Sequence, residues 1–129
     1  MRFNSGAGED SSSYKNNGTV NGAIQNTSGR FGSAMDFDGV NDIINISSSD
    51  STNLTGDYTY EAWIYPLGLG ENSAGRIFDK GVYLFSIGST LSQRVIRISQ
   101  GGTTYESSLG VYSFNVWQHI AAVYNQSAT

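Results

Sequence analysis

A strict two-residue alternation between Tyr58 and Tyr65 constrains the fold of this chain more than any other feature. Successive side chains of an extended strand point to opposite faces, so such a pattern predicts a β-strand with two chemically different faces. One face carries Tyr58, Tyr60, Ala62 and Ile64, and the other carries Thr59, Glu61, Trp63 and Tyr65. Pro66 ends the run, because proline cannot donate to a strand ladder.

Shorter runs of the same kind follow one another at close spacing, separated by Gly, Asn and Asp. No segment of twelve residues has a helical period, so an all-β, antiparallel fold is expected. Asp38-Gly39 is a hairpin signal between two of these runs. The further strands are expected at residues 34–38, 42–47, 76–80, 82–87, 93–99, 103–108 and 116–125.

Residues 1–33 form a polar, loop-rich opening segment. Gly and Asn recur where turns require positive φ, which favours a long ordered loop with short strands over a disordered arm. Tyr14, Val20 and Ile24 are the expected apolar anchors of this segment.

Composition excludes several kinds of site. The 129 residues include no Cys and one His, which rules out disulfides, thiolate zinc sites and sites that need two histidines. The net charge of −4 argues against a nucleic-acid partner, which requires a basic surface. The apolar runs are too short to span a bilayer, so no membrane insertion is expected.

Four segments, in order and spacing, resemble the concanavalin A-like lectin/glucanase superfamily, in particular its laminin-G-like domains. They are Gly29 to Gly39 (GRFGSAMDFDG), Tyr58 to Pro66 (YTYEAWIYP), Ile77 to Gly81 (IFDKG) and Trp117 to Tyr124 (WQHIAAVY). The resemblance implies one laminin-G-like domain over 1–129, a two-sheet antiparallel jelly-roll sandwich. It also implies truncation at both ends, because only Arg2-Phe3 remains of the opening edge strand and the later strands of the family are absent. We therefore expect either that the chain is part of a longer protein or that another protein chain completes or covers a sheet edge.

Catalysis is not expected. Glucanases that share this fold use two carboxyl groups on either side of the scissile bond. Glu61 is the only carboxylate on its strand, and Glu106 has no acidic neighbour. His119 lies within a strand between Trp117 and Ala121, as a hydrogen-bonded structural histidine would.

Calcium is the one cofactor that the sequence suggests. Asp36, Asp38, Asn41 and Asp42 crowd one predicted hairpin, and hard oxygen ligands suit Ca²⁺. The alternative is that these residues form turns and cap backbone groups. The resemblance also favours a calcium site, since relatives often carry calcium near a loop rim.

Sugar binding needs exposed aromatic faces beside polar groups. The candidates lie near loops or strand ends and are Tyr65, Tyr83, Tyr105 and Tyr112. Packing in the core is the alternative for each of them. Trp63 and Trp117 lie within strands and are predicted to be core residues.

The sequence therefore predicts a non-catalytic recognition or adhesion module, extracellular or on a virion surface, with a carbohydrate or glycoconjugate as the leading ligand. The alternative is a decoration or fibre-associated protein of a virion or cell surface that acts through assembly. An exposed aromatic cluster beside a polar loop would favour binding, whereas burial of that surface against a neighbouring chain would favour assembly.

Overall fold

A computed structural model describes residues 1, 3, 8–88 and 93–128. Arg2, part of the predicted opening edge strand, lies outside these residues. The described chain contains ten strands, joined in antiparallel pairs, and three short 3-10 turns, which confirms the all-β class. It divides into two compact units, Met1–Thr55 and Gly56–Thr129, and each is described by itself.

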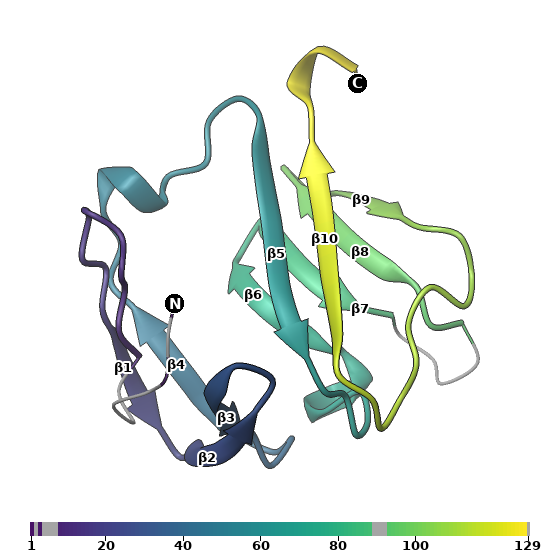
Figure 1. Cartoon of the computed structure of the whole chain (residues 1–129). Coiled ribbons are helices and arrows are strands. Elements are labelled where there is room, and N and C mark those ends of the chain that lie inside the picture. The colour runs from purple at the N-terminus through teal and green to yellow at the C-terminus, as the bar shows by residue number, and fades with distance from the viewer. Residues whose placement is uncertain (2, 4–7, 89–92, 129) are drawn as a thin grey trace. The chain divides into compact units, whose positions relative to one another are not determined.

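The first unit consists of two antiparallel strand pairs (Figure 1). β1 (Gly18–Asn21) pairs with β4 (Ile43–Ile46), and β2 (Ile24–Gly29) pairs with β3 (Gly32–Asp36). A 3-10 turn, η1 (Asp50–Thr52), follows β4. The opening segment thus contains short strands, as expected.

Two predictions for this unit are wrong. The expected hairpin at Asp38-Gly39 does not form, since β3 pairs with β2 and β4 pairs with β1. The Asp38 carboxylate instead accepts the Val40 amide at 2.8 Å, which bends the chain into a wider loop. Tyr14 and Ile24 are not core anchors, because they are 70% and 72% exposed.

The second unit has two layers (Figure 1). The front layer is formed by β5 (Tyr58–Ile64) and β10 (Gln118–Tyr124), which pair along their whole length. The back layer has the order β6-β7-β8-β9, and a short 3-10 turn, η2 (Glu71–Ser73), precedes it. Its strands are β6 (Arg76–Lys80), β7 (Tyr83–Ile87), β8 (Ile96–Gln100) and β9 (Thr103–Glu106). The last turn, η3, is Gln126–Ala128.

The apolar core of this unit lies between its layers. Its buried residues are Leu69, Phe85, Ile87, Ile98, Tyr112 and Ile120. The face of β5 that carries Tyr60, Ala62 and Ile64 packs against them, and the Tyr60 ring stacks on Phe85 with centroids 5.4 Å apart. The alternation of the sequence therefore separates a buried face of β5 from an exposed one.

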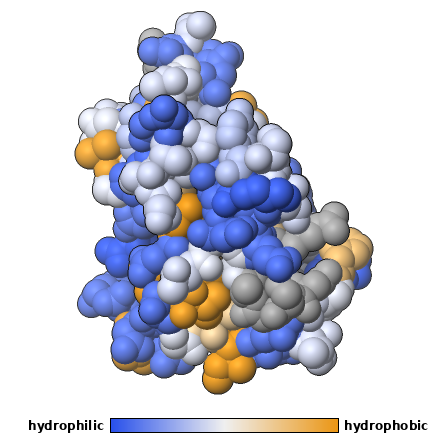
Figure 2. All heavy atoms as spheres, turned by 90° about the vertical axis from the view of Figure 1, so that its left-hand side faces the viewer, coloured by the Kyte–Doolittle hydropathy of each residue, from blue (hydrophilic) through white to orange (hydrophobic). Residues whose placement is uncertain are grey.

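The surface seen in Figure 2 is mostly hydrophilic, and its hydrophobic residues form small separate patches. Among the described residues, no helix is long and apolar enough to cross a membrane.

Candidate functional site

The outer face of the β5–β10 pair carries a group of exposed rings, which we call the aromatic face. Its members are Trp63, Tyr65, Trp117 and His119, with the Glu61 carboxylate beside them. Trp63 is 42% exposed and Tyr65 is 43% exposed, while Trp117 is half-buried. Large aromatic side chains usually bury most of their surface, so this exposure on one face is informative.

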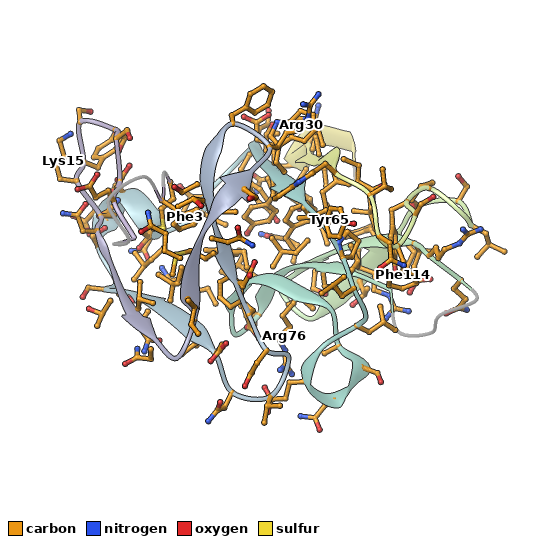
Figure 3. The ribbon with its side chains drawn as sticks, turned by 60° about the horizontal axis from the view of Figure 1, so that its bottom comes forward. Phe3, Lys15, Arg30, Tyr65, Arg76 and Phe114 are labelled. Carbon is orange, nitrogen blue, oxygen red and sulfur yellow. The ribbon has the colours of Figure 1, made fainter. Side chains whose placement is uncertain are left out.

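The rings form two cross-strand pairs. Trp63 lies opposite His119 in the strand register, and their ring centroids are 5.5 Å apart. Tyr65, labelled in Figure 3, directly follows β5 and meets Trp117 edge to face, also at 5.5 Å. Each ring supports its partner from the side and leaves part of its surface in solvent.

Glu61 and His119 add polar groups to this face. His119 Nε2 lies 3.5 Å from Glu61 Oε2, and the two side chains are 41% and 68% exposed. Such an exposed pair contributes little to stability because water screens it. The Glu61 carboxylate can instead accept hydrogen bonds from a ligand above the rings.

The prediction that Trp63 is a core residue is wrong. The inner face of β5 is occupied by Tyr60, Ala62 and Ile64, so alternation turns Trp63 outward. Trp117 is only partly buried, against Tyr65. The alternation within Tyr58–Tyr65 already contained this signal, because it placed Trp63 on the same face as Glu61.

Of the four tyrosines predicted to bind sugar, only Tyr65 lies on the aromatic face. Tyr83 is half-buried at the start of β7, and Tyr105 is 41% exposed on β9. Both strands belong to the back layer.

The prediction that Tyr112 binds sugar is wrong, because its side chain is 1% exposed and cannot present a ring to a sugar. It packs edge to face against Phe114, also labelled in Figure 3, with centroids 5.5 Å apart. Burial raises the pKa of the Tyr112 hydroxyl, although Arg94 and Arg97 oppose the shift.

Two of the four predicted calcium ligands, Asp38 and Asp42, cap turn amides. Asp42 Oδ2 accepts the Asp38 amide at 2.8 Å, and Asp38 Oδ1 accepts the Val40 and Asn41 amides. Asp36 Oδ2 accepts a hydrogen bond from the Asn26 side chain at 2.9 Å. The described residues contain no group of three or more His, Cys, Asp or Glu side chains placed to hold a metal ion. Calcium binding by this turn stays a prediction.

Residues 38–129 match the family model of the concanavalin A-like lectin/glucanases superfamily. The chain belongs to this superfamily, as the resemblance in its sequence predicted. No curated protein and no solved structure gave a match. The superfamily fits a carbohydrate-binding or adhesion-type module, and its laminin-G-like domains are generally non-catalytic.

Proposed function

We propose that this protein is a non-catalytic carbohydrate-recognition module that acts outside the cell or on a virion surface. The observation that carries the proposal is the exposure of Trp63 and Tyr65 on one sheet face. Sugar rings have apolar C–H faces that stack on aromatic rings, and their hydroxyl groups require polar partners nearby. The aromatic face offers both, with Glu61 as an acceptor and His119 as a donor or acceptor.

The absence of catalysis is part of the proposal. Glycoside hydrolysis by the usual route needs two carboxyl groups that flank the bond. β5 and β10 carry a single carboxylate between them, that of Glu61. We therefore assign Glu61 to hydrogen bonding with a glycan rather than to proton transfer.

A glycan array followed by calorimetric titration tests the proposal. We expect the wild-type chain to bind at least one glycan, and both Trp63→Ala and Tyr65→Ala to weaken binding by about tenfold or more, since stacking surface is lost. Glu61→Gln should weaken binding less and leave the stacking intact.

Tyr105→Ala is the matched control, because Tyr105 is as exposed as Tyr65 but lies on the back layer. It should bind glycan like the wild type. Equal losses in Tyr65→Ala and Tyr105→Ala, or release of reducing sugar that Glu61→Gln abolishes, would contradict the proposal.

The alternative, a structural role through assembly, is favoured by a different observation. β10 pairs with β5 alone, so one of its edges has no neighbouring strand among the described residues.

A further inference from the structure

The charge of the β5–β10 pair comes from one carboxylate. Glu61 is the only acidic residue of the two strands, which contain no Lys or Arg. Its side chain is 68% exposed, and its neighbour His119 is charged only when protonated. A ligand on the aromatic face therefore lies beside a negative charge.

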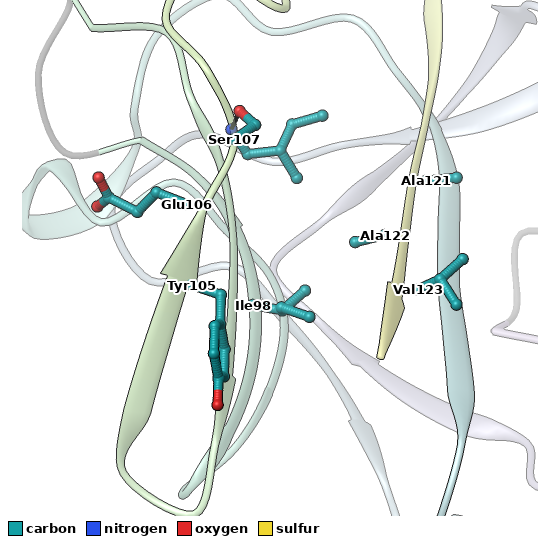
Figure 4. A pocket seen from close by; sticks show the side chains of 8 residues that line it. Ile98, Tyr105, Glu106, Ser107, Ala121, Ala122 and Val123 are labelled. Carbon is teal, nitrogen blue, oxygen red and sulfur yellow. Dashed lines mark hydrogen bonds between the residues drawn. The ribbon is translucent and has the colours of Figure 1, made fainter. Parts of the chain in front are cut away.

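The outer side of β10 continues beyond His119 without a charge. Ala121 and Val123 point away from Ala122 and from the back layer (Figure 4), and Val123 is 69% exposed. Glu106, which Figure 4 also labels, belongs to β9 of the back layer and forms an ion pair with Arg97. These side chains leave Glu61 as the group that sets the charge beside the rings.

The rings of the aromatic face form two rows across the strands. Trp63 and His119 form one row, and Tyr65 and Trp117 form the other, with ring centroids 5.5 Å apart within each row. Trp63 and Tyr65 are two positions apart in the sequence, so the rows are separated by roughly 7 Å, twice the rise of a strand residue. This separation is comparable with the length of one sugar unit in a glycan chain. Two consecutive sugar rings can therefore stack, one on each row.

We propose that the aromatic face selects neutral glycans with at least two consecutive sugar rings, and that Glu61 discriminates against acidic glycans. This inference rests on the proposed function, since it names the class of glycan that the same face binds. The hydroxyl groups of a neutral sugar can donate hydrogen bonds to the Glu61 carboxylate. An acidic group above the same rings would meet a like charge, and binding would remove water from both groups.

The test of charge is a glycan array at pH 8, where histidine side chains are uncharged. Each neutral glycan is printed beside the same glycan with its C6 CH₂OH groups oxidised to carboxylates, which changes charge at nearly constant shape. The wild type should bind the acidic member of a pair about fivefold more weakly, the effect of like charges roughly 5 Å apart in water. The difference should shrink at 1 M NaCl, where the screening length falls to about 3 Å.

Glu61→Gln is the test variant, and Glu106→Gln is the matched control. Both remove one negative charge from a chain with a net charge of −4. Glu61→Gln should lose the discrimination, since it binds acidic glycans more tightly than the wild type and neutral glycans slightly less tightly. Glu106→Gln should discriminate like the wild type, because its carboxylate lies on the back layer beside Arg97.

The length of the glycan is tested by competition with fragments of a neutral glycan that the array identifies. The disaccharide should inhibit about tenfold better than the monosaccharide, because it adds a second stacking contact. Trp63→Ala should reduce this difference, since it removes one row.

Three results would overturn this inference and leave the proposed function standing. They are equal or tighter binding of acidic members by the wild type, equal changes in Glu61→Gln and Glu106→Gln, and equal inhibition by monosaccharide and disaccharide. Binding of no glycan at all would overturn both.

Discussion

The two compact units of this chain are stabilised by different interactions. Gly56–Thr129 encloses a cluster of apolar side chains, among them Phe85, which is 1% exposed. Among the described residues of Met1–Thr55, only Ala23 and Met35 are buried apolar side chains. Its loops are instead held by hydrogen bonds that backbone amides donate to side-chain oxygens.

The loop around Asp10 illustrates how hydrogen bonds to side chains hold the first unit. The Asp10 carboxylate accepts hydrogen bonds from the Ser12 hydroxyl and from the Ser12 and Asn16 amides, at 2.7–2.8 Å. These bonds, with the Ser12 hydroxyl first, lower the pKa of Asp10 below its ordinary value of 3.8. A carboxyl group whose pKa is lower in the folded state than in the unfolded state stabilises the fold above its ordinary pKa. This stabilisation is lost as the pH falls. The first unit is therefore held by hydrogen bonds at its turns, whereas the second is held by apolar burial.

The largest effect should come from emptying the apolar core. Phe85→Ala should lower the free energy of unfolding by about 3–5 kcal/mol, because it removes a buried ring and leaves a cavity. Chemical denaturation measures this change. Phe31→Ala is the matched control in the first unit, since Phe31 is 69% exposed and contacts the Arg30 guanidinium. It should cost about 1 kcal/mol or less, and similar losses in both variants would remove the contrast between the units.

A smaller effect should come from a tight turn in the first unit. Gly22 has a φ of 83°, and a Cβ added there would lie 1.9 Å from Asp42 Oδ1. Gly22→Ala should therefore cost about 1–3 kcal/mol, because it adds backbone strain and displaces the carboxylate that caps Asp38. Gly81→Ala separates these causes, since Gly81 has a φ of 70° and no atom within 4 Å of such a Cβ. Equal losses in the two variants would mean that contact with Asp42 does not matter.

An alkaline titration tests the core of the second unit. Burial raises the pKa of Tyr60 well above its ordinary value of 10.0, with smaller contributions from Tyr58 and Tyr83. A group whose pKa is higher in the folded state than in the unfolded state contributes its full stabilisation of the fold below pH 10. This stabilisation is lost as the pH rises above 10. The Tyr60 hydroxyl is buried and has no hydrogen-bond partner among the described residues.

Tyr60→Phe should therefore raise the free energy of unfolding by about 1 kcal/mol at pH 7, and it should lose less stability than the wild type above pH 10. Denaturation at pH 7, 9 and 11 provides the measurement. A variant that is less stable than the wild type at pH 7 would indicate that the hydroxyl is satisfied in solution.

Calcium should have the smallest effect. The Asp38 and Asp42 carboxylates already cap turn amides, so we expect only a weak site. At 1 mM Ca²⁺, a site with a Kd of about 1 mM stabilises by about 0.4 kcal/mol. Melting curves with CaCl₂ and with EDTA should differ by that amount, and Asp38→Asn should remove the difference. A large rise in Tm with calcium would mean that the turn rearranges around the ion.

The sequence predicted the strands well, because side-chain alternation acts locally. The observed bounds of β5, β6 and β10 fall within or on the predicted ones. It predicted strand pairing poorly in the first unit. The Asp38-Gly39 turn signal suggested that the two neighbouring strands pair with each other, but β3 pairs with β2 and β4 pairs with β1. It placed Tyr65 near a strand end, where the ring is exposed, and it wrongly placed Trp63 in the core, since hydrophobicity alone suggested that a tryptophan within a strand belongs there.

The sequence by itself determined that this chain is all-β, that it belongs to the concanavalin A-like superfamily, and that β5 has two different faces. The strand class and the two faces follow from the two-residue period and the turn residues, which act over a few positions. The superfamily follows from the resemblance of four segments in order and spacing, and the family model matches residues 38–129. Only the tertiary structure decided which face of β5 is buried, that Tyr112 lies in the core, and that β10 has a neighbour on one side alone among the described residues. The physical reason is that burial and edge pairing depend on which distant segments meet, and no local pattern contains that information.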